Sequence, residues 1–335
     1  MKIKDMEFYS SLFFMIQSCL GGFIIDDTIK LVKNDAWIIP IVGSIIGFAI
    51  LKLYLYIFNN NVNISQLFKT KIVNTIYIIL IILLMDTIFL SLISFISTGY
   101  LYDTPPLFII VLITLTILYV LKNNTNSLFR TALIFFYLFL ITYFIVTIGL
   151  IRQVNFLNIM PIFNFKMTNF IIAVFHYVIY TTIPLLSILY YKKSTMENIS
   201  NKKITITYFL AHLSIFLIIF TLILVFGVNL ASLYQYPGYH ILKRAFAGAF
   251  VERLEKILAI YWIISMLIPI MFWANIILNK LKKNYFIITL IIISNYFLLT
   301  NITLITYWNE TLFPIIMSSF IVLSILICIK KKLSN

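Results

Sequence analysis

Ten long apolar runs, separated by short polar breaks, constrain this chain more than any other feature of its sequence. An α-helix needs about 20 apolar residues, with a range of about 17–25, to cross a bilayer, and the runs meet or approach this length. The longest gap between them, residues 231–253, has no room for a soluble domain. The sequence therefore predicts a single all-α integral membrane domain over residues 1–335. The predicted spans are 8–25, 37–58, 72–98, 106–121, 131–150, 168–191, 204–230, 254–278, 285–302 and 311–329.

Composition and charge agree with this class. Hydrophobic residues make up 62% of the chain and charged residues only 11%, with a mean hydropathy of +1.05, whereas a soluble domain carries about a quarter charged residues. The net charge of +14 does not indicate a nucleic-acid-binding groove, because the cations lie in the short breaks between runs. With ten spans and an inner N-terminus, the inner segments carry about twice as many lysines and arginines as the outer ones. We therefore expect both termini in the cytoplasm.

No motif in the sequence indicates catalysis. There is no glycine-rich phosphate loop, no Ser-x-x-Lys and no His-Glu-x-x-His, and the three histidines lie on separate segments. Cys19 and Cys328 form neither a metal-binding spacing nor a disulfide framework. We predict no catalytic residue, no metal and no cofactor, and hence no enzyme. Ten-span membrane acyltransferases and polysaccharide polymerases remain a minor alternative for a chain of this size.

Two of the runs are interrupted at matched positions. Gly21-Gly22 interrupts the first span, and Thr181-Thr182-Ile183-Pro184 interrupts the sixth. In transporters built from two inverted halves of five spans, corresponding broken helices bind substrate, because unwound backbone exposes N–H and C=O groups. Close packing at the glycines and a plain kink at Pro184 remain the alternative. The predicted ligand-binding residues at the two breaks are Gly21, Gly22, Tyr180, Thr181 and Thr182.

Asp86 is the only carboxylate well inside an apolar run. Its insertion costs at least about 2.5–3.5 kcal/mol, so we expect it to face the bundle interior or a wet cavity. There it would contact a proton or ligand, or pin two helices by a hydrogen bond. His176 in the sixth span and Ser265 in the eighth are further candidates for the pocket, with a helix-bridging hydrogen bond as the alternative.

The segment 236–255 holds a turn, five charges and two glycines between two apolar runs. Tyr236-Pro237-Gly238 predicts the turn, because Pro fixes φ and Gly accepts positive φ. An amphipathic pattern then predicts a short external helix over about residues 238–248, which Gly248 ends. A plain interfacial helix is one reading. The four cations of residues 231–256 lie on the predicted outer side, against the charge bias, which favours a structural or functional role.

Two motifs in the chain resemble those of a known family. One is Tyr236-Pro237-x-Tyr239-x-x-Leu242-Lys243, followed by Gly248-x-Phe250-x-Glu252-Arg253-Leu254-Glu255. The other is Asn34-Asp35-Ala36-Trp37-Ile38, followed by Gly43-x-x-x-Gly47 and Leu53-Tyr54. Their order, the span count and the length are similar to the spore-germination receptor B subunits (GerAB type), which belong to the amino acid–polyamine–organocation (APC) transporter superfamily. The resemblance covers essentially the whole chain.

This resemblance implies a LeuT-like fold of five plus five spans with broken helices one and six. It also implies a subunit in the spore inner membrane, beside A- and C-type partner subunits, that recognises a small nutrient and triggers germination. The pocket would then lie around the two breaks, with Asp86 and Ser265 nearby. A secondary amino-acid transporter of the same superfamily is the alternative function. The family-motif residues, which would serve gating or assembly, are Tyr236, Pro237, Tyr239, Lys243, Gly248, Glu252, Arg253 and Glu255.

Overall fold

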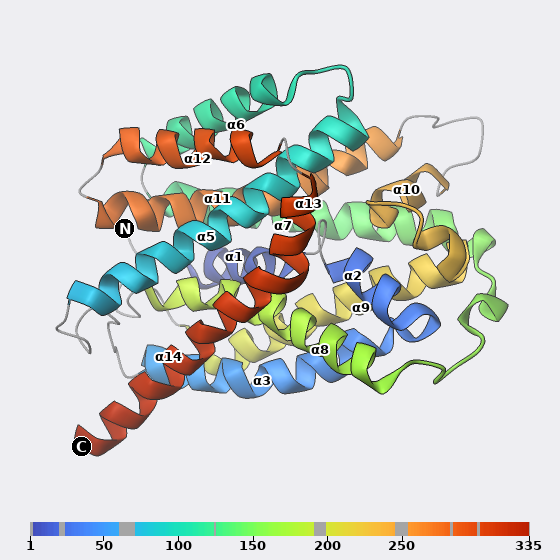
Figure 1. Cartoon of the computed structure of the whole chain (residues 1–335), viewed down its shortest axis with the longest axis horizontal. Helices are drawn as coiled ribbons and strands as arrows, with labels where there is room; N and C mark the ends of the chain where they lie inside the picture. The colour runs from blue at the N-terminus through green and yellow to red at the C-terminus, as the bar shows by residue number, and fades with distance from the viewer. Residues whose placement is uncertain are drawn as a thin grey trace.

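In the computed structural model every element of the described residues is helical, and the long helices run side by side as a bundle (Figure 1). The structure describes residues 3–19, 24–59, 71–123, 125–190, 199–244, 254–281, 284–299 and 302–334. The α-helices are α1 (Asp5–Gln17), α2 (Ile25–Val32), α3 (Ile38–Asn59), α5 (Lys71–Phe95), α6 (Pro106–Leu121), α7 (Thr125–Leu150), α8 (Met167–Thr182), α9 (Asn201–Ala231), α10 (Pro237–Arg244), α11 (Leu254–Lys280), α12 (Tyr285–Leu299), α13 (Ile302–Tyr307) and α14 (Phe313–Ser334). The 3-10 and π segments are η2 (Lys33–Asp35), η3 (Ile96–Tyr100), η4 (Ile151–Gln153), η5 (Phe156–Ile159), η6 (Pro184–Tyr190) and η8 (Trp308–Leu312).

Within the described ranges, seven helical stretches are long and apolar enough to cross a membrane. They are Ile38–Asn59, Thr75–Tyr100, Thr125–Gln153, Met167–Ser187, Asn201–Ala231, Trp262–Lys280 and Leu304–Leu326. The three other predicted spans, 8–25, 106–121 and 285–302, are also occupied by helices. However, α1 and α2 are separate helices, α6 has 16 residues and α12 has 15, so each is shorter than a single crossing requires. The architecture is that of an all-α integral membrane protein.

The first and sixth predicted spans are each divided. α1 ends at Gln17 and α2 begins at Ile25, and the predicted glycine pair Gly21-Gly22 lies outside the described residues. In the sixth span α8 ends at Thr182, and the backbone continues from Pro184 as the 3-10 segment η6. Pro184 lacks the N–H that would extend the α-helical ladder, which accounts for a new segment beginning there.

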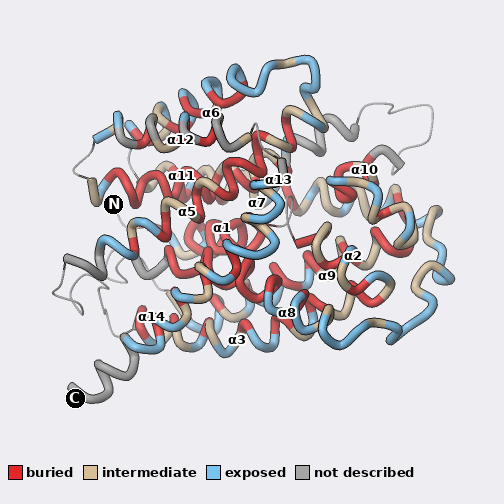
Figure 2. The backbone as a smooth tube through the Cα atoms, in the orientation of Figure 1, coloured by how far each residue is buried: buried red, intermediate tan, exposed pale blue. Residues whose placement is uncertain are grey.

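Helix α1 forms the centre of the bundle. Every residue from Glu7 to Gln17 is buried, and α1 contacts α7, α9 and α11. Figure 2 shows buried backbone around α1, whereas α6 carries many exposed positions. Most side chains of α1 are apolar, as expected of a helix enclosed by its neighbours. The outer helices turn apolar side chains toward the surrounding lipid instead.

Gly43 and Gly47 bring α3 into close contact with α8 and α9. A Cβ atom on Gly43 would overlap the ring of Tyr177, and one on Gly47 would lie 2.8 Å from Thr182 Cγ2. The Tyr177 hydroxyl in turn lies 2.6 Å from Nδ1 of His212 on α9. Small residues at this spacing let membrane helices approach closely, so the Gly43-x-x-x-Gly47 motif acts through packing.

Candidate functional site

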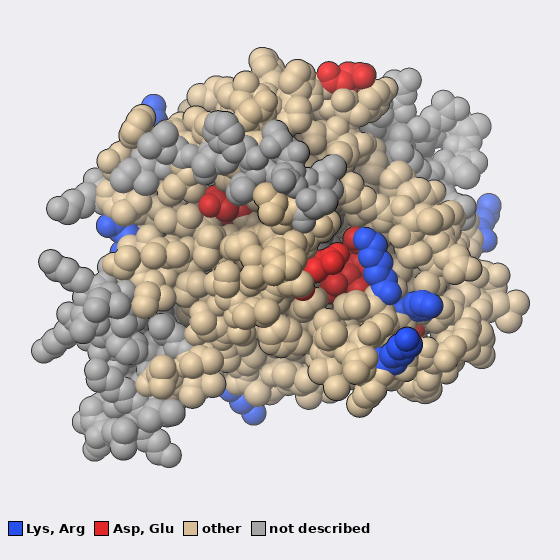
Figure 3. Space-filling model, in the orientation of Figure 1, with Lys and Arg blue, Asp and Glu red and all other residues tan. Residues whose placement is uncertain are grey.

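A polar pocket of about 450 Å³ lies between α2, α5, α8, η8 and the segment before α10. Figure 3 shows a cluster of acidic side chains bordered by basic ones on this face, over the position of α2 in Figure 1. Two of the bordering segments, η3 and η8, are π-helical, a geometry that is frequent at functional sites. The residues that line the pocket are Asp26, Asp27, Lys30, Leu90, Ser91, Ser94, Ser97, Thr98, Pro106, Tyr180, Gln235, Tyr236, Leu299, Ile305, Thr306, Asn309 and Glu310.

Helix α2 supplies most of the charge of the pocket. Lys30 Nζ donates to Asp26 Oδ2 over 2.7 Å, one helical turn away. Asp27 Oδ2 lies 2.8 Å from Nδ1 of His176 on α8. Glu310 adds a third carboxylate from η8. The lining therefore holds three acids and one lysine, so it favours a ligand with a positive charge.

Two buried polar atoms of the pocket have no hydrogen-bond partner among the described residues. They are Asp26 Oδ1 and Ser91 Oγ. Ser91 is 7% exposed, so bulk water does not satisfy its hydroxyl. Buried polar groups are nearly always paired, by protein, ordered water or a bound molecule. Asp26 Oδ1 can therefore accept a hydrogen bond from a molecule in the pocket, and Ser91 Oγ can donate or accept one.

Two tyrosines connect the walls of the pocket. The Tyr180 hydroxyl on α8 donates to the Asn309 carbonyl in η8 over 2.6 Å. The Tyr236 hydroxyl donates to Ser94 Oγ on α5 over 2.9 Å. Burial raises the pKa of Tyr236 to about 12, so this phenol stays protonated and keeps its donor role. Each bond joins segments that are far apart in the sequence, and so ties two walls of the pocket together.

A second, mostly apolar pocket of about 280 Å³ adjoins the first, and the two share Leu90 and Ile305. Asp86 lines it, and Asp86 Oδ1 accepts a hydrogen bond from Asn295 Nδ2 on α12 over 3.0 Å. Trp308 Nε1 donates to Thr87 Oγ1 over 2.9 Å in the same wall. Asp86 therefore bridges α5 and α12 and lines a cavity, and the contact with a proton or ligand stays a prediction.

A family model described as spore germination protein matches residues 7–284 of the chain. The chain belongs to the spore germination protein family. No curated protein matches it. The matched range contains both motifs on which the resemblance rested. This is a permease- or receptor-type membrane family, not a family of enzymes.

In this spore germination protein, the structure brings only some of the predicted ligand-binding residues to the polar pocket. Tyr180 lines it, and His176 borders it through Asp27. Thr181 and Thr182 are fully buried and donate to backbone carbonyls of their own helix. Ser265 donates in the same way to the Trp262 carbonyl. None of these three hydroxyls is among the residues that line the pocket.

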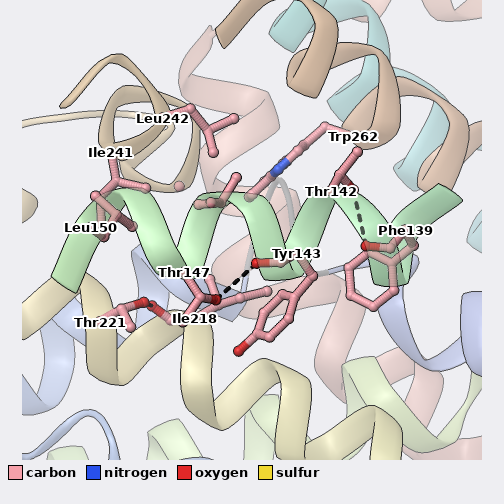
Figure 4. A pocket seen from close by; sticks show the side chains of 12 residues that line it. Phe139, Thr142, Tyr143, Thr147, Leu150, Ile218, Thr221, Ile241, Leu242 and Trp262 are labelled. Carbon is pink, nitrogen blue, oxygen red and sulfur yellow. Dashed lines mark hydrogen bonds between the residues drawn. The ribbon is translucent and has the colours of Figure 1, made fainter. Parts of the chain in front are cut away.

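The described part of the family motif, residues 236–244, packs against side chains of α5 and α11. The Tyr236 and Tyr239 rings pack edge-on against Phe95, at 5.1 and 5.5 Å between centroids. A Cβ atom on Gly238 would lie 2.5 Å from the Trp262 ring. The predicted external helix is α10, whose side chains lie over a small apolar cavity of about 70 Å³ between α7, α9 and α11, as Figure 4 shows for Ile241 and Leu242.

The rest of that motif is less fully described. Gly248, Glu252 and Arg253 lie outside the described residues. Lys243 is in α10 and Glu255 is in α11, but the structure does not describe their side chains. The predicted gating or assembly role of these residues stays a prediction.

Sequence reasoning missed the acidic pair Asp26-Asp27 as part of the site. The signal was present, since two adjacent carboxylates directly follow an apolar run and Lys30 lies one turn further on. It also missed what the Asn34-Asp35 motif does. Both carboxylate oxygens of Asp35 accept backbone N–H groups, from Phe163 and Asn164, over 2.8 Å each. This motif anchors the connection between α7 and α8.

Proposed function

We propose that this spore germination protein is the membrane subunit of a nutrient-germinant receptor, and that the polar pocket binds the nutrient. It works beside A- and C-type subunits in the spore inner membrane, with both termini in the cytoplasm. The LeuT-like arrangement of five plus five spans is part of the proposal. The divided first and sixth spans support it, because they correspond in the two halves.

The observation that carries the proposal is the unpaired Asp26 Oδ1 in a pocket whose acids outnumber its cation. The volume of about 450 Å³ lies within the range of about 300–1,000 Å³ that is usual for small-molecule sites. A primary ammonium group is a compact donor that suits a carboxylate oxygen. The serine and threonine hydroxyls of α5 and η3 would bind the polar remainder of such a ligand. The proposed ligand is a small amine, such as an amino acid.

Asp26→Asn tests this proposal in spores. The substitution removes the charge but keeps the shape, so we expect the germinant concentration for half-maximal response to rise by about tenfold or more, which corresponds to about 1.4 kcal/mol. Release of dipicolinic acid against a panel of amino acids and small amines measures the response. Immunoblots of spore membranes check the protein level.

Lys30→Gln is the matched control, because it breaks the same ion pair but leaves the carboxylate in place. We expect it to retain or strengthen the response to amines. An Asp26→Asn strain that responds like the wild type at equal protein level would contradict a ligand role for this carboxylate.

A secondary transporter remains the second candidate, favoured by the same pair of divided helices. The two functions differ in one measurable quantity. Steady accumulation of a labelled amine in proteoliposomes that contain the purified protein would indicate transport. Saturable binding without accumulation would indicate a receptor.

A further inference from the structure

The connection between α7 and α8, residues 151–166, is held in place by hydrogen bonds although it contains little regular structure. We call it the α7–α8 loop. Asp35 binds it at Phe163 and Asn164, and the Asn34 amide donates to the carbonyls of Asn158 and Met160. At its other side, the backbone N–H of Asn155 and the side chain of Asn158 donate to the Leu224 carbonyl over 3.0 and 2.8 Å. The loop therefore has a fixed conformation.

This fixed conformation turns large apolar side chains outward. Phe156, Leu157 and Phe163 are 70%, 77% and 72% exposed. Figure 2 shows the loop as a mostly exposed stretch at the end of the bundle where α2 and α10 lie. Exposure of such side chains to water is unfavourable, and clustered exposed apolar residues mark a surface that contacts a partner or a membrane.

The lipid-facing sides of the two flanking helices continue into this surface. Ile148 near the end of α7 and Met167 at the start of α8 are both largely exposed. The loop thus connects the ends of two helical stretches that are long and apolar enough to cross a membrane, and lipid headgroups lie at the ends of such stretches. A soluble partner would not need an apolar surface that is continuous with the membrane-embedded one.

The charge of the loop indicates which headgroups it meets. Arg152 and Lys166 are exposed at its two ends, and Lys33 is exposed next to its Asn34 anchor. Residues 151–167 contain no aspartate or glutamate. Apolar and aromatic side chains flanked by cations are typical of segments that lie in the interface of an anionic membrane. We propose that the α7–α8 loop inserts Phe156, Leu157 and Phe163 into the headgroup region of an anionic lipid leaflet.

Site-specific fluorescence tests this inference. In a Cys19→Ser, Cys328→Ser background, bimane is attached at Phe156→Cys or at Leu157→Cys, and the protein is placed in nanodiscs of phosphatidylglycerol or phosphatidylcholine. In both lipids we expect bimane at these sites to emit at a shorter wavelength than at a water-exposed control site, and to be quenched by brominated acyl chains. Quenching should be stronger in phosphatidylglycerol, and Arg152→Gln with Lys166→Gln should remove that difference. The control is Asp103→Cys, in the exposed connection between α5 and α6. There we expect bimane to be quenched by iodide in water and not by brominated acyl chains.

Two results would overturn the inference. One is bimane at residues 156 and 157 that behaves like the Asp103 control, with full access to iodide and no effect of brominated lipid. The other is shielding of these sites only when further receptor subunits are purified together with the chain, which would identify the surface as a protein interface. The test does not depend on the polar pocket, so its outcome is separate from that of the proposed function.

Discussion

His176 and Asp27 form a contact between α8 and α2, two helices that border the polar pocket. Their side chains are only 10% and 16% exposed, and Nδ1 and Oδ2 are 2.8 Å apart. A hydrogen bond to a charged group contributes about 1.5–3 kcal/mol, and its loss leaves the remaining partner poorly solvated. This contact should therefore stabilise the packing of α2 against α8 as well as the shape of the pocket.

A double-mutant cycle with Asp27→Ala and His176→Ala tests that contact. We expect each single substitution to lower the free energy of unfolding by about 1.5–3 kcal/mol, and the double substitution to cost little more than either one. Denaturant unfolding of the purified protein in detergent gives the values. The exposed pair of Asp5 and Lys203, whose charged atoms are 2.7 Å apart, is the control and should couple by less than about 1 kcal/mol. Strict additivity at Asp27 and His176 would show that they do not interact.

For single residues, the sequence indicated which polar side chains need a hydrogen-bond partner better than it indicated where that partner lies. His176 was recognisable because a histidine in an apolar span needs a partner, but its partner lies 149 residues away. Thr181 and Thr182 have the chemistry of ligand-binding residues, yet hydroxyls in a helix also bond to carbonyls of the preceding turn. Which of the two occurs depends on the direction of each side chain in the bundle, and that direction follows from packing against other helices.

Among the elements, the contact of α3 with α8 and α9 depends most directly on a missing side chain. Gly43→Ala should force α3 and α8 apart, because the new Cβ would overlap the rigid Tyr177 ring of α8. Overpacking of this kind costs about 1–3 kcal/mol, and the same unfolding assay measures it. Gly99→Ala is the matched control, since its Cβ would lie 3.7 Å from the nearest atom, in the Phe95 ring. Equal stability of the two variants would contradict close packing at Gly43.

Helix positions were predictable from hydropathy, whereas helix irregularities were less so. The break before Pro184 follows from proline chemistry, and α10 begins within a residue of the predicted start. The π-helical segments η3 and η8 and the positive φ of Gly227 were not predicted. Such features depend on contacts with other elements. In the case of Gly227, the nearby Leu224 carbonyl accepts hydrogen bonds from Asn155 and Asn158 of the α7–α8 loop.

For the molecule as a whole, the path of the chain leaves both ends on the same side of the bundle. In Figure 1, α14 ends at the side of the bundle from which α1 starts, opposite α10 and the α7–α8 loop. We expect tags at both termini to be cleaved by protease added to inverted membrane vesicles. Leu233→Cys, at an exposed position between α9 and α10, should be labelled from the outside of intact cells. Labelling of residue 233 on the same side as the tags would refute this topology.

The class of the molecule was the most predictable level, because the bilayer requires long apolar helices whatever their arrangement. The location of the polar pocket was not predictable. It is built from residues of α2, α5, α8 and η8, and only their packing brings these together. The spore-germination motifs gave the family, but most of their described residues fix the α7–α8 loop or pack against the helices of the bundle, and among them Tyr236 alone lines the pocket.

The anchoring of the α7–α8 loop has a mechanical consequence. Asn34 and Asp35 lie in η2, which follows α2, and the loop that they hold leads into α8. The Asn169 amide of α8 donates to the Leu31 carbonyl over 3.3 Å. Together with the His176–Asp27 contact, these bonds link α2, the loop and the first part of α8 into one hydrogen-bonded unit. We therefore expect a displacement of the loop to be transmitted through α2 to Asp26 in the pocket.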